Sequence, residues 1–339
     1  MKKCCFVTGA TGFIASHLVD GLLQEGFQVR CLIRKNSNID YLKQHNIEFV
    51  YGDLTDFESL RKGLQGCNYV FHCAGFVSDW GTINEIRQVN VEGTRHLLEA
   101  SLEQPFCRFI YLSTTDVYGH TNQKNVSEQQ PYPAKFCNWY TQTKMEAELE
   151  VMRFHTRYQL PVTIIRPATV YGPRSINVIG EISNAIQSGQ MLLINKGQAN
   201  AGLCYISNLI HAIILASESD AAIGECFNVA DKNKVSWKTF IDDLAGQLGE
   251  QKKYYNMPYG LAIAIGWLLE SGYRVIRMIT GLKFPALLSR QAVHVMGTEQ
   301  DFNTDKIQSL LGYQPKVNYQ TGLKETVNWI KKLKVANTP

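Results

Sequence analysis

The sequence predicts a doubly wound α/β fold, built on a parallel sheet and followed by a smaller, mainly helical subdomain. Short apolar strands alternate with amphipathic helical stretches through the first half of the chain, and a glycine-rich turn joins the first strand to the first helix. After about residue 172 the alternation gives way to helical stretches and a long apolar segment. Such alternation is typical of parallel strands that are joined by right-handed crossovers and buried on both faces.

The elements follow in a regular order along the chain. Residues 3–9 (KCCFVTG) are expected to form the first strand, and residues 13–26 (FIASHLVDGLLQEG) a helix that ends at Gly26. Apolar runs predict further strands at residues 28–34, 47–54, 69–75, 108–114 and 162–168. Helices are then expected at residues 176–189 and 207–218, and a late strand at residues 224–230.

This order predicts two functional parts. The nucleotide-binding part is expected to comprise residues 1–172, together with residues 203–230, which return to it. The substrate-binding subdomain is expected to comprise residues 173–202 and 231–339. Residues 257–296 are apolar and aromatic, and the breaks at Gly266, Gly272, Gly281 and Pro285 predict several short helices that cap one end of the sheet. The alternatives for this segment are the packed core of the subdomain, a movable lid, or contact with a membrane surface or a second subunit in a homodimer.

Composition and charge exclude several classes of protein. Of 339 residues, 45% are hydrophobic and 19% charged, as in a folded globular protein. A net charge of +4, from 34 basic and 30 acidic residues, is too balanced to indicate nucleic-acid binding. The sequence has no apolar run of membrane-span length and no metal-site Cys/His spacing. Nine scattered cysteines, several in apolar runs, predict free thiols and a cytoplasmic location.

Residues 7–18 (VTGATGFIASHL) have the pattern of a dinucleotide-binding turn. Gly9 and Gly12 permit a tight turn and let a pyrophosphate approach backbone N–H groups, while the helix that starts near Phe13 adds positive potential. Ala15 is the small residue that allows the helix to pack closely on the strand. In this context the predicted fold is Rossmann-type.

The residues after the second strand indicate which cofactor is preferred. An NAD site usually has a carboxylate there for the ribose hydroxyls, whereas this chain has Arg34 and Lys35. Two cations favour a 2′-phosphate, so NADP(H) is predicted to be preferred, with NAD(H) possible. Asp53 after the third strand can accept from the adenine amino group. Small residues at Ala74 and Gly75 leave room for the cofactor backbone.

Hydroxyl groups and a Tyr/Lys pair are the candidates for catalysis. The expected strand at residues 108–114 ends in Ser113, Thr114 and Thr115, at the edge where ligands of such sheets bind. Residues 138–148 (NWYTQTKMEAE) are expected to be helical, which puts Tyr140 and Lys144 on one face. By spacing alone this pair is equally compatible with a solvent-facing turn.

Taken in order, the motifs resemble those of the extended short-chain dehydrogenase/reductase superfamily, which includes the NAD-dependent epimerase/dehydratase and 3β-hydroxysteroid dehydrogenase branches. The matching stretches are TGxxGxxA, GDL, HCAG, STTDVYG, the Tyr140/Lys144 pair and IIRPATVYGPR, and they span nearly the whole chain. The resemblance, anchored on residues 117–119 (VYG), implies that Thr114 is the catalytic hydroxyl, with Thr115 as the alternative.

The resemblance also assigns roles to the pair and to the cofactor-binding residues. Tyr140 is implied to transfer the proton, and Lys144 to bind the nicotinamide ribose. A free phenol has a pKa of about 10; a cation about 5 Å away, at an effective dielectric of about 20, lowers it by about two units. The implied cofactor-binding residues are Gly9, Thr11, Gly12, Phe13, Ile14, Arg34, Lys35, Asp53, Leu54, Ala74, Gly75, Tyr140, Lys144, Pro167, Ala168 and Val170.

The branch of the superfamily sets the expected substrate. Nucleotide-sugar enzymes tend to carry a TRDF-like stretch whose arginine meets a diphosphate, whereas residues 200–212 (NAGLCYISNLIHA) lack it; Arg174 and Arg290 remain possible contacts. The RCLIRKNSN and FVSDWG stretches resemble dihydroflavonol-reductase-like and 3β-hydroxysteroid dehydrogenase-like enzymes. The sequence therefore predicts an NADP(H)-dependent oxidoreductase for a ketone or secondary alcohol of a hydrophobic molecule. The alternatives are a nucleotide-sugar epimerase, dehydratase or reductase, and a non-catalytic cofactor-sensing regulator.

Overall fold

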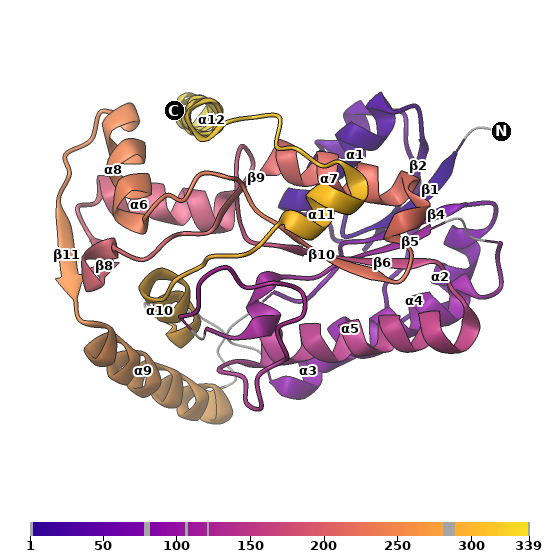
Figure 1. The fold of residues 1–339 in the computed structure, drawn as a ribbon, viewed down its shortest axis with the longest axis horizontal. Helices are drawn as coiled ribbons and strands as arrows, with labels where there is room; N and C mark the ends of the chain where they lie inside the picture. The colour runs from indigo at the N-terminus through magenta and orange to yellow at the C-terminus, as the bar shows by residue number, and fades with distance from the viewer. Residues whose placement is uncertain (1–2, 78–81, 106–107, 121, 281–288, 338–339) are drawn as a thin grey trace.

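The computed structural model describes residues 3–77, 82–105, 108–120, 122–280 and 289–337. Seven parallel strands form its central sheet in the order β10-β6-β5-β4-β1-β2-β3 (Figure 1). The strands are β1 Cys4–Thr8, β2 Gln28–Ile33, β3 Glu48–Tyr51, β4 Tyr69–His72, β5 Arg108–Leu112, β6 Val162–Pro167 and β10 Glu225–Val229. Strands β2 and β3 are added on one side of β1, whereas β4 and the later strands are added on its other side. The strand order therefore reverses between β1 and β4, and ligands of open α/β sheets bind at such a switch point.

Helices cover both faces of this sheet, which confirms the predicted doubly wound fold. One face carries α1 Phe13–Gln24 and α7 Ile206–Glu218, and the other carries α2 Phe57–Leu64, α4 Gly93–Ser101 and α5 Trp139–Tyr158 (Figure 1). In α1, Ala15, Leu18, Val19 and Leu22 recur at three- and four-residue spacing and are buried against the sheet. Leu97 of α4 and Val151 of α5 are buried in a second core on the opposite face.

Short elements connect these layers. They are η1 Leu42–Gln44, α3 Ile83–Arg87, the π-helical turn η2 Gln88–Glu92, η3 Thr115–Tyr118 and η6 Asp220–Ala222. The π-helical turn widens the helix between α3 and α4, and π turns of this kind are frequent at functional sites.

The C-terminal region is mainly helical, as predicted, and most of it lies to the left of the sheet in Figure 1, whereas its helix at Asp305–Leu311 packs against β10. Its helices are η4 Ile176–Gly180, α6 Glu181–Gln187, η5 Asn195–Gly197, α8 Trp237–Leu248, α9 Tyr259–Thr280, α10 Arg290–Gly297, α11 Asp305–Leu311 and α12 Tyr319–Asn337. Two small parallel sheets, β7 Thr169–Tyr171 with β9 Leu203–Tyr205 and β8 Met191–Ile194 with β11 Tyr254–Met257, were not predicted. Strands of three or four residues are too short to give a periodic signal.

The prediction that glycines divide residues 257–296 into short helices is wrong for the described part. Helix α9 continues from Tyr259 to Thr280 through Gly266 and Gly272. A side chain at Gly266 would bring its Cβ to 3.2 Å from Cγ of Arg290, so the glycine admits α10 rather than ending α9. Gly281 and Pro285 lie outside the described residues. No helix in the described ranges is long and apolar enough to cross a membrane.

Candidate active site

The glycine-rich turn lies at the switch point between β1 and β4. Gly9 has a φ of +73°, and a Cβ at this position would lie 2.8 Å from the backbone N and Cα of Ala74. The turn closes through a hydrogen bond from Gly12 N–H to the Gly9 carbonyl at 2.8 Å. Gly12 precedes the first turn of α1, in which Phe13 and Ile14 are half-buried, while Thr11 is exposed. The N-terminus of α1 therefore follows a tight backbone turn at which Gly9 and Gly12 carry no side chain, which suits the close approach of a pyrophosphate.

The residues predicted to meet the adenosine end stand after neighbouring strands. Arg34 and Lys35 directly follow β2, are exposed, and form no ion pair within the described residues. Asp53 follows β3, and its Oδ1 accepts hydrogen bonds from the backbone N and Oγ1 of Thr55, both at 3.0 Å. That leaves Oδ2 of Asp53 for another donor.

The other members of the predicted cofactor set surround the same edge. Ala74 N–H donates to Oγ1 of Thr8 at 3.2 Å, and Gly75 follows it in an exposed loop. Leu54 is buried in the core. Pro167 ends β6 and is buried, and Val170 in β7 is half-buried. Ala168 N–H donates to the Val229 carbonyl at 3.0 Å, which fixes this corner against β10.

Accessibility distinguishes the three hydroxyl residues after β5. Ser113 is 5% exposed and Thr115 is 3% exposed, whereas Thr114 between them is half-buried. Thr114 caps the turn η3, and its Oγ1 accepts a hydrogen bond from Asp116 N–H at 3.2 Å. The Thr114 hydroxyl therefore keeps its own proton available for a ligand, and it is the most accessible of the three.

Tyr140 and Lys144 lie one turn apart at the start of α5. Oδ1 of Asn138 caps this helix by accepting from Thr141 N–H at 2.7 Å. Tyr140 is half-buried and Lys144 is only 4% exposed. Nζ of Lys144 donates to the Leu112 carbonyl at 2.6 Å and lies 4.1 Å from the centroid of the Tyr111 ring. The pair is therefore anchored at the end of β5, directly before the three hydroxyl residues.

Burial changes the acid–base behaviour of Lys144. Loss of hydration lowers its pKa to about 8, while the carboxylate of Glu148 one turn later opposes this change. The ammonium is therefore still the main form at neutral pH. A cation near a tyrosine hydroxyl favours the tyrosinate, and this is the electrostatic effect that was predicted for Tyr140.

A chain of hydrogen bonds lies next to the glycine-rich turn, and its partners determine which atom donates at each step. Thr94 Oγ1 donates to the Asn90 carbonyl at 2.6 Å, so it accepts from Nε2 of His72 at 2.8 Å. Nδ1 of His72 then accepts from the Thr8 hydroxyl at 2.7 Å, whose oxygen accepts from Ala74 N–H. Burial and the charge of Lys144 lower the His72 pKa to about 3, so the imidazole stays neutral.

Asn90, in the π-helical turn, links this chain to α5. Its Oδ1 accepts from Phe76 N–H at 2.6 Å, and its Nδ2 donates to the Thr143 hydroxyl at 3.1 Å. Thr143 in turn donates to the Tyr140 carbonyl at 2.9 Å. The glycine-rich turn and the backbone of Tyr140 therefore belong to one continuous polar network.

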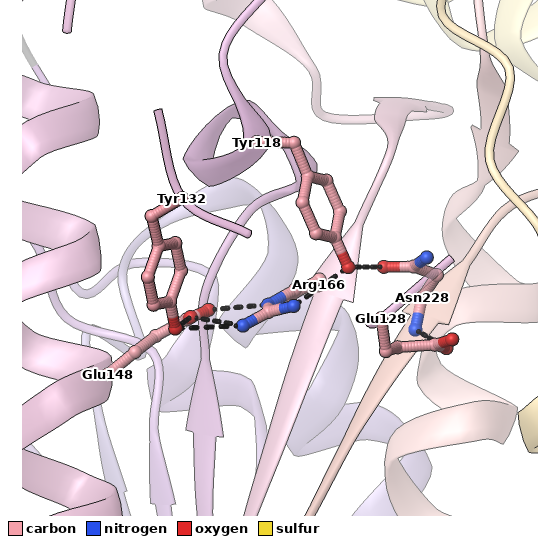
Figure 2. Close-up of polar contacts among 6 residues, drawn as sticks. All are labelled: Tyr118, Glu128, Tyr132, Glu148, Arg166 and Asn228. Atoms are coloured by element: carbon pink, nitrogen blue, oxygen red, sulfur yellow. Dashed lines mark hydrogen bonds and ion pairs between the residues drawn. The ribbon is translucent and has the colours of Figure 1, made fainter. Parts of the chain in front are cut away.

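A buried ion pair fixes α5 to β6 (Figure 2). The Arg166 guanidinium donates to both Glu148 oxygens, from Nε at 2.9 Å and from Nη2 at 2.6 Å. The guanidinium also donates to the hydroxyls of Tyr118 at 2.8 Å and Tyr132 at 3.0 Å. Tyr118 donates to Asn228 of β10 at 2.7 Å, and the backbone N–H of Asn228 donates to Glu128. Segments of β6, β10, α5 and the η3–α5 connection meet here.

Sequence reasoning missed His72, Asn90 and the Arg166–Glu148 pair. His72 and Arg166 could have been noticed in the sequence, because each stands in a strand that was predicted to be buried. A buried charged or polar group requires a partner. The identity of that partner was not deducible, since Arg166 and Glu148 come from different elements.

An apolar pocket lies on α9 in the C-terminal region. It has a volume of about 470 Å³ and is lined by Gly260, Ile263, Ala264, Trp267, Leu268 and Arg290. Helix α10 packs on α9, and its His294 stacks on His120, which follows η3, with ring centroids 5.3 Å apart. Arg174 and Arg290, the two candidate diphosphate contacts, are paired with Asp20 and Glu270 respectively, each at 2.7 Å.

Comparison with known proteins supplies a family and relatives. Residues 5–230 match the model of the NAD dependent epimerase/dehydratase family. The chain is 27% identical to 3beta-hydroxysteroid-dehydrogenase/decarboxylase isoform 1 of Arabidopsis thaliana, over 100% of this chain and 82% of the relative. It is 28% identical to 4-hydroxy-2-methyl-3-oxo-4-farnesyl-3,4-dihydroquinoline-1-oxide ketoreductase of Stigmatella aurantiaca, over 94% of each chain. The fold is that of UDP-glucose 4-epimerase from Thermotoga maritima, with a TM-score of 0.80, 23% identity, and coverage of 98% of this chain and 99% of the other.

Proposed function

Because the chain belongs to the NAD-dependent epimerase/dehydratase family and is an NAD(P)-dependent enzyme of the extended short-chain dehydrogenase/reductase type, we propose that it interconverts a ketone and a secondary alcohol of a hydrophobic substrate with NADP(H). Residues 1–172 and 203–230 hold the cofactor in this proposal, and residues 173–202 and 231–339 hold the substrate. The place of β10 beside β6 in the main sheet supports this division.

The observation that carries the proposal is the anchoring of Lys144, one helical turn after Tyr140, on the carbonyl of Leu112, which stands two residues before Thr114. When bound, the nicotinamide supplies or accepts the hydride. In the direction of reduction, the Tyr140 hydroxyl gives its proton to the substrate oxygen, and Thr114 donates a hydrogen bond to the same oxygen. The ammonium of Lys144 stabilises the tyrosinate that remains. The buried contact of Lys144 with Leu112 supports this role, because it fixes the charge at the end of β5, two residues before Thr114.

The cofactor assignment rests on the glycine-rich turn at Gly9 and on the exposed pair Arg34 and Lys35. A phosphate on the adenosine ribose would find two cations there that are not neutralised by carboxylates of the described residues. Oδ2 of Asp53, which accepts no hydrogen bond from the described residues, suits the adenine amino group. These features support NADP(H) over NAD(H).

The substrate class rests on the pocket and on the paired arginines. An apolar pocket in the proposed substrate-binding part favours a hydrophobic body, since burial of apolar surface contributes about 25 cal/mol per Å². Arg174 and Arg290 are already paired with carboxylates, so a sugar diphosphate would find no unpaired arginine at either position. The names of the two curated relatives refer to a hydroxysteroid and to a farnesyl-bearing ketone.

The test compares the reduction of a 3-oxo steroid by NADPH and NADH with the conversion of UDP-glucose in the presence of NADP+ and NAD+. We expect the steroid to be reduced, faster with NADPH, and Tyr140→Phe to lower turnover by about 10² or more while NADPH affinity stays nearly unchanged. Thr114→Ala should lower turnover less, and Thr115→Ala less again. Turnover of the nucleotide sugar alone would overturn the substrate class. Near-normal turnover in Tyr140→Phe would overturn the mechanism, and NADPH binding without any turnover would favour a cofactor sensor.

A further inference from the structure

Helix α10 connects the apolar helix α9 with the segments that carry the proposed reactive groups. Its first residue, Arg290, is anchored on α9, because its backbone N–H and its Nε donate to the Glu270 carboxylate at 2.8 and 2.7 Å. The next residue, Gln291, is half-buried and hydrogen-bonds instead to the loops of the nucleotide-binding part.

The side-chain amide of Gln291 joins two segments that are distant in sequence. Its Nε2 donates to Oδ2 of Asp116 at 3.0 Å, and its Oε1 accepts from Nδ2 of Asn138 at 2.5 Å. His120 Nε2 and Cys137 Sγ approach the same oxygen, at 3.2 and 3.4 Å. One amide therefore holds η3, the residues after it and the start of α5 together.

The partners determine which way this amide is oriented. The Asp116 carboxylate can only accept, so it requires the NH₂ group of Gln291. Oδ1 of Asn138 is used by Thr141 N–H, so Asn138 offers its own NH₂ to Oε1 of Gln291. His120 matches this pattern when Nε2 carries the proton, since its Nδ1 faces the NH₂ of Gln300 at 3.4 Å. A primary amide satisfies both neighbours, whereas a carboxylate does not.

One partner, Asp116, hydrogen-bonds to a proposed reactive residue, and the other, Asn138, hydrogen-bonds to Thr141, the residue after Tyr140. The backbone N–H of Asp116 donates to the Thr114 hydroxyl at 3.2 Å. Asn138 caps α5, whose second residue is Tyr140. The relative position of the Thr114 hydroxyl and the Tyr140 turn therefore depends on a residue of the C-terminal region.

We infer that Gln291 is a positioning residue that sets the geometry between Thr114 and Tyr140 through Asp116 and Asn138. This assignment rests on the proposed function, because it presumes that Thr114 and Tyr140 act on one substrate oxygen. It also explains how helix α10, which packs on the apolar helix α9, is connected to the reacting groups. Misplacement of catalytic groups by about 1 Å is known to cost large factors in rate.

Two substitutions separate this role from simple structural support. Gln291→Leu removes both hydrogen bonds, and Gln291→Glu retains them only when its carboxyl is protonated. The neighbouring Asp116 carboxylate raises the pKa of the introduced acid by like-charge repulsion. At about pH 8 we expect both variants to reduce a 3-oxo steroid with kcat about tenfold below the parent, and with the NADPH Kd within about twofold.

The pH dependence gives the decisive comparison. As the pH falls to about 5.5, the kcat of Gln291→Glu relative to the parent should recover to within about twofold, while that of Gln291→Leu stays low. The titratable groups around Gln291 are Asp116, His120, Cys137 and, stacked on His120, His294. These groups are common to both variants, so only recovery that is confined to Gln291→Glu supports the assignment. Equal ratios at both pH values would overturn it.

A second measurement needs no substrate. In the NADPH complex, Gln291→Leu should increase hydrogen exchange at the N–H groups of Asp116 and Thr141. The matched control is Gln308→Leu on α11, which removes one amide hydrogen bond, to Thr304 at 2.8 Å, and should leave both unchanged. Unchanged exchange in Gln291→Leu would overturn the assignment. If Gln291 variants behave as the parent while Tyr140→Phe is inactive, only the role of Gln291 fails; if Tyr140→Phe is active, the proposed function fails.

Discussion

Lys144 is a residue at which the needs of catalysis and of stability oppose each other. Its ammonium is 4% exposed and its pKa is lowered to about 8, chiefly by burial. In the unfolded chain a lysine has a pKa of about 10.4. The folded protein therefore binds this proton less tightly than the unfolded chain does. The cost to stability is fully present below about pH 8 and disappears as the pH rises through the unfolded value.

We predict that Lys144→Met abolishes turnover and yet raises the free energy of unfolding by about 1 to 3 kcal/mol at pH 7. The gain should shrink between about pH 8 and 10.5, because the parent lysine becomes neutral over that range. Urea denaturation at several pH values measures both effects. A variant that is less stable than the parent at pH 7 would show that the hydrogen bond to Leu112 outweighs the cost of burying the charge.

Arg34 is the residue on which the cofactor preference is expected to depend. It is exposed at the end of β2 and is not paired with a carboxylate of the described residues, so its charge is available to a phosphate. Arg34→Ala should weaken NADP(H) binding by about tenfold or more and change NAD(H) binding by less than about twofold. Isothermal titration with both cofactors measures this, and Arg61→Ala on α2, paired with Glu58, serves as the control. Equal losses for the two cofactors would mean that Arg34 does not meet a 2′-phosphate.

At the scale of elements, the Arg166–Glu148 pair decides how α5 is held on the sheet. Arg166 is 3% exposed and Glu148 is fully buried, so neither charge has water as an alternative partner. The pair brings α5, which carries Tyr140 and Lys144, against β6, which leads to Pro167 (Figure 2). Removal of one partner leaves the other buried and unpaired, which typically costs about 3 to 5 kcal/mol.

We therefore predict that Arg166→Met lowers the free energy of unfolding by about 3 kcal/mol or more. Substitution of both charges, as in Arg166→Met with Glu148→Leu, should restore at least half of the loss, because no unpaired charge remains. Arg153→Met on the same helix is the matched control, since its pair with Glu150 is exposed and should contribute less than about 0.5 kcal/mol. A double variant as unstable as the single one would indicate that packing, not charge, dominates here.

At the scale of the whole molecule, α9 presents an apolar face that the fold leaves uncovered. Its large side chains Leu261, Trp267, Leu268, Leu269 and Ile276 are exposed, while its single carboxylate, Glu270, is buried and paired with Arg290. This face is therefore not the packed core of the C-terminal region. Large exposed apolar side chains gathered on one helix are a candidate binding surface for a ligand, a membrane or another subunit.

We predict that Leu268→Lys, in the α9 pocket, raises the KM for a 3-oxo steroid by about tenfold with little change in NADPH affinity. Leu261→Lys changes an exposed leucine of the same helix outside the pocket and should leave the KM within about twofold. Steady-state kinetics with both variants measures this. Equal effects of the two substitutions would point to the whole apolar face, as in membrane or subunit contact, rather than to the pocket.

Local features of the sequence determined the sheet, its nucleotide edge and the candidate pair. A left-handed turn next to another backbone admits only glycine, so Gly9 was recognisable before any neighbour was known. Likewise a four-residue spacing on a helix places Tyr140 and Lys144 on one face, whatever surrounds them. Strand and helix alternation is equally local, which is why the order of elements followed from the chain.

The tertiary structure decided the properties that depend on neighbours far away in sequence. Three consecutive hydroxyl residues look alike in the chain, and only packing leaves Thr114 accessible between Ser113 and Thr115. The partner of Arg166, the continuity of α9 through Gly266 and the reach of α10 to Asp116 likewise come from contacts between elements. The burial, the pKa and the hydrogen-bond partners of a residue depend on which surfaces pack together. A local sequence pattern does not specify the surface that packs against it.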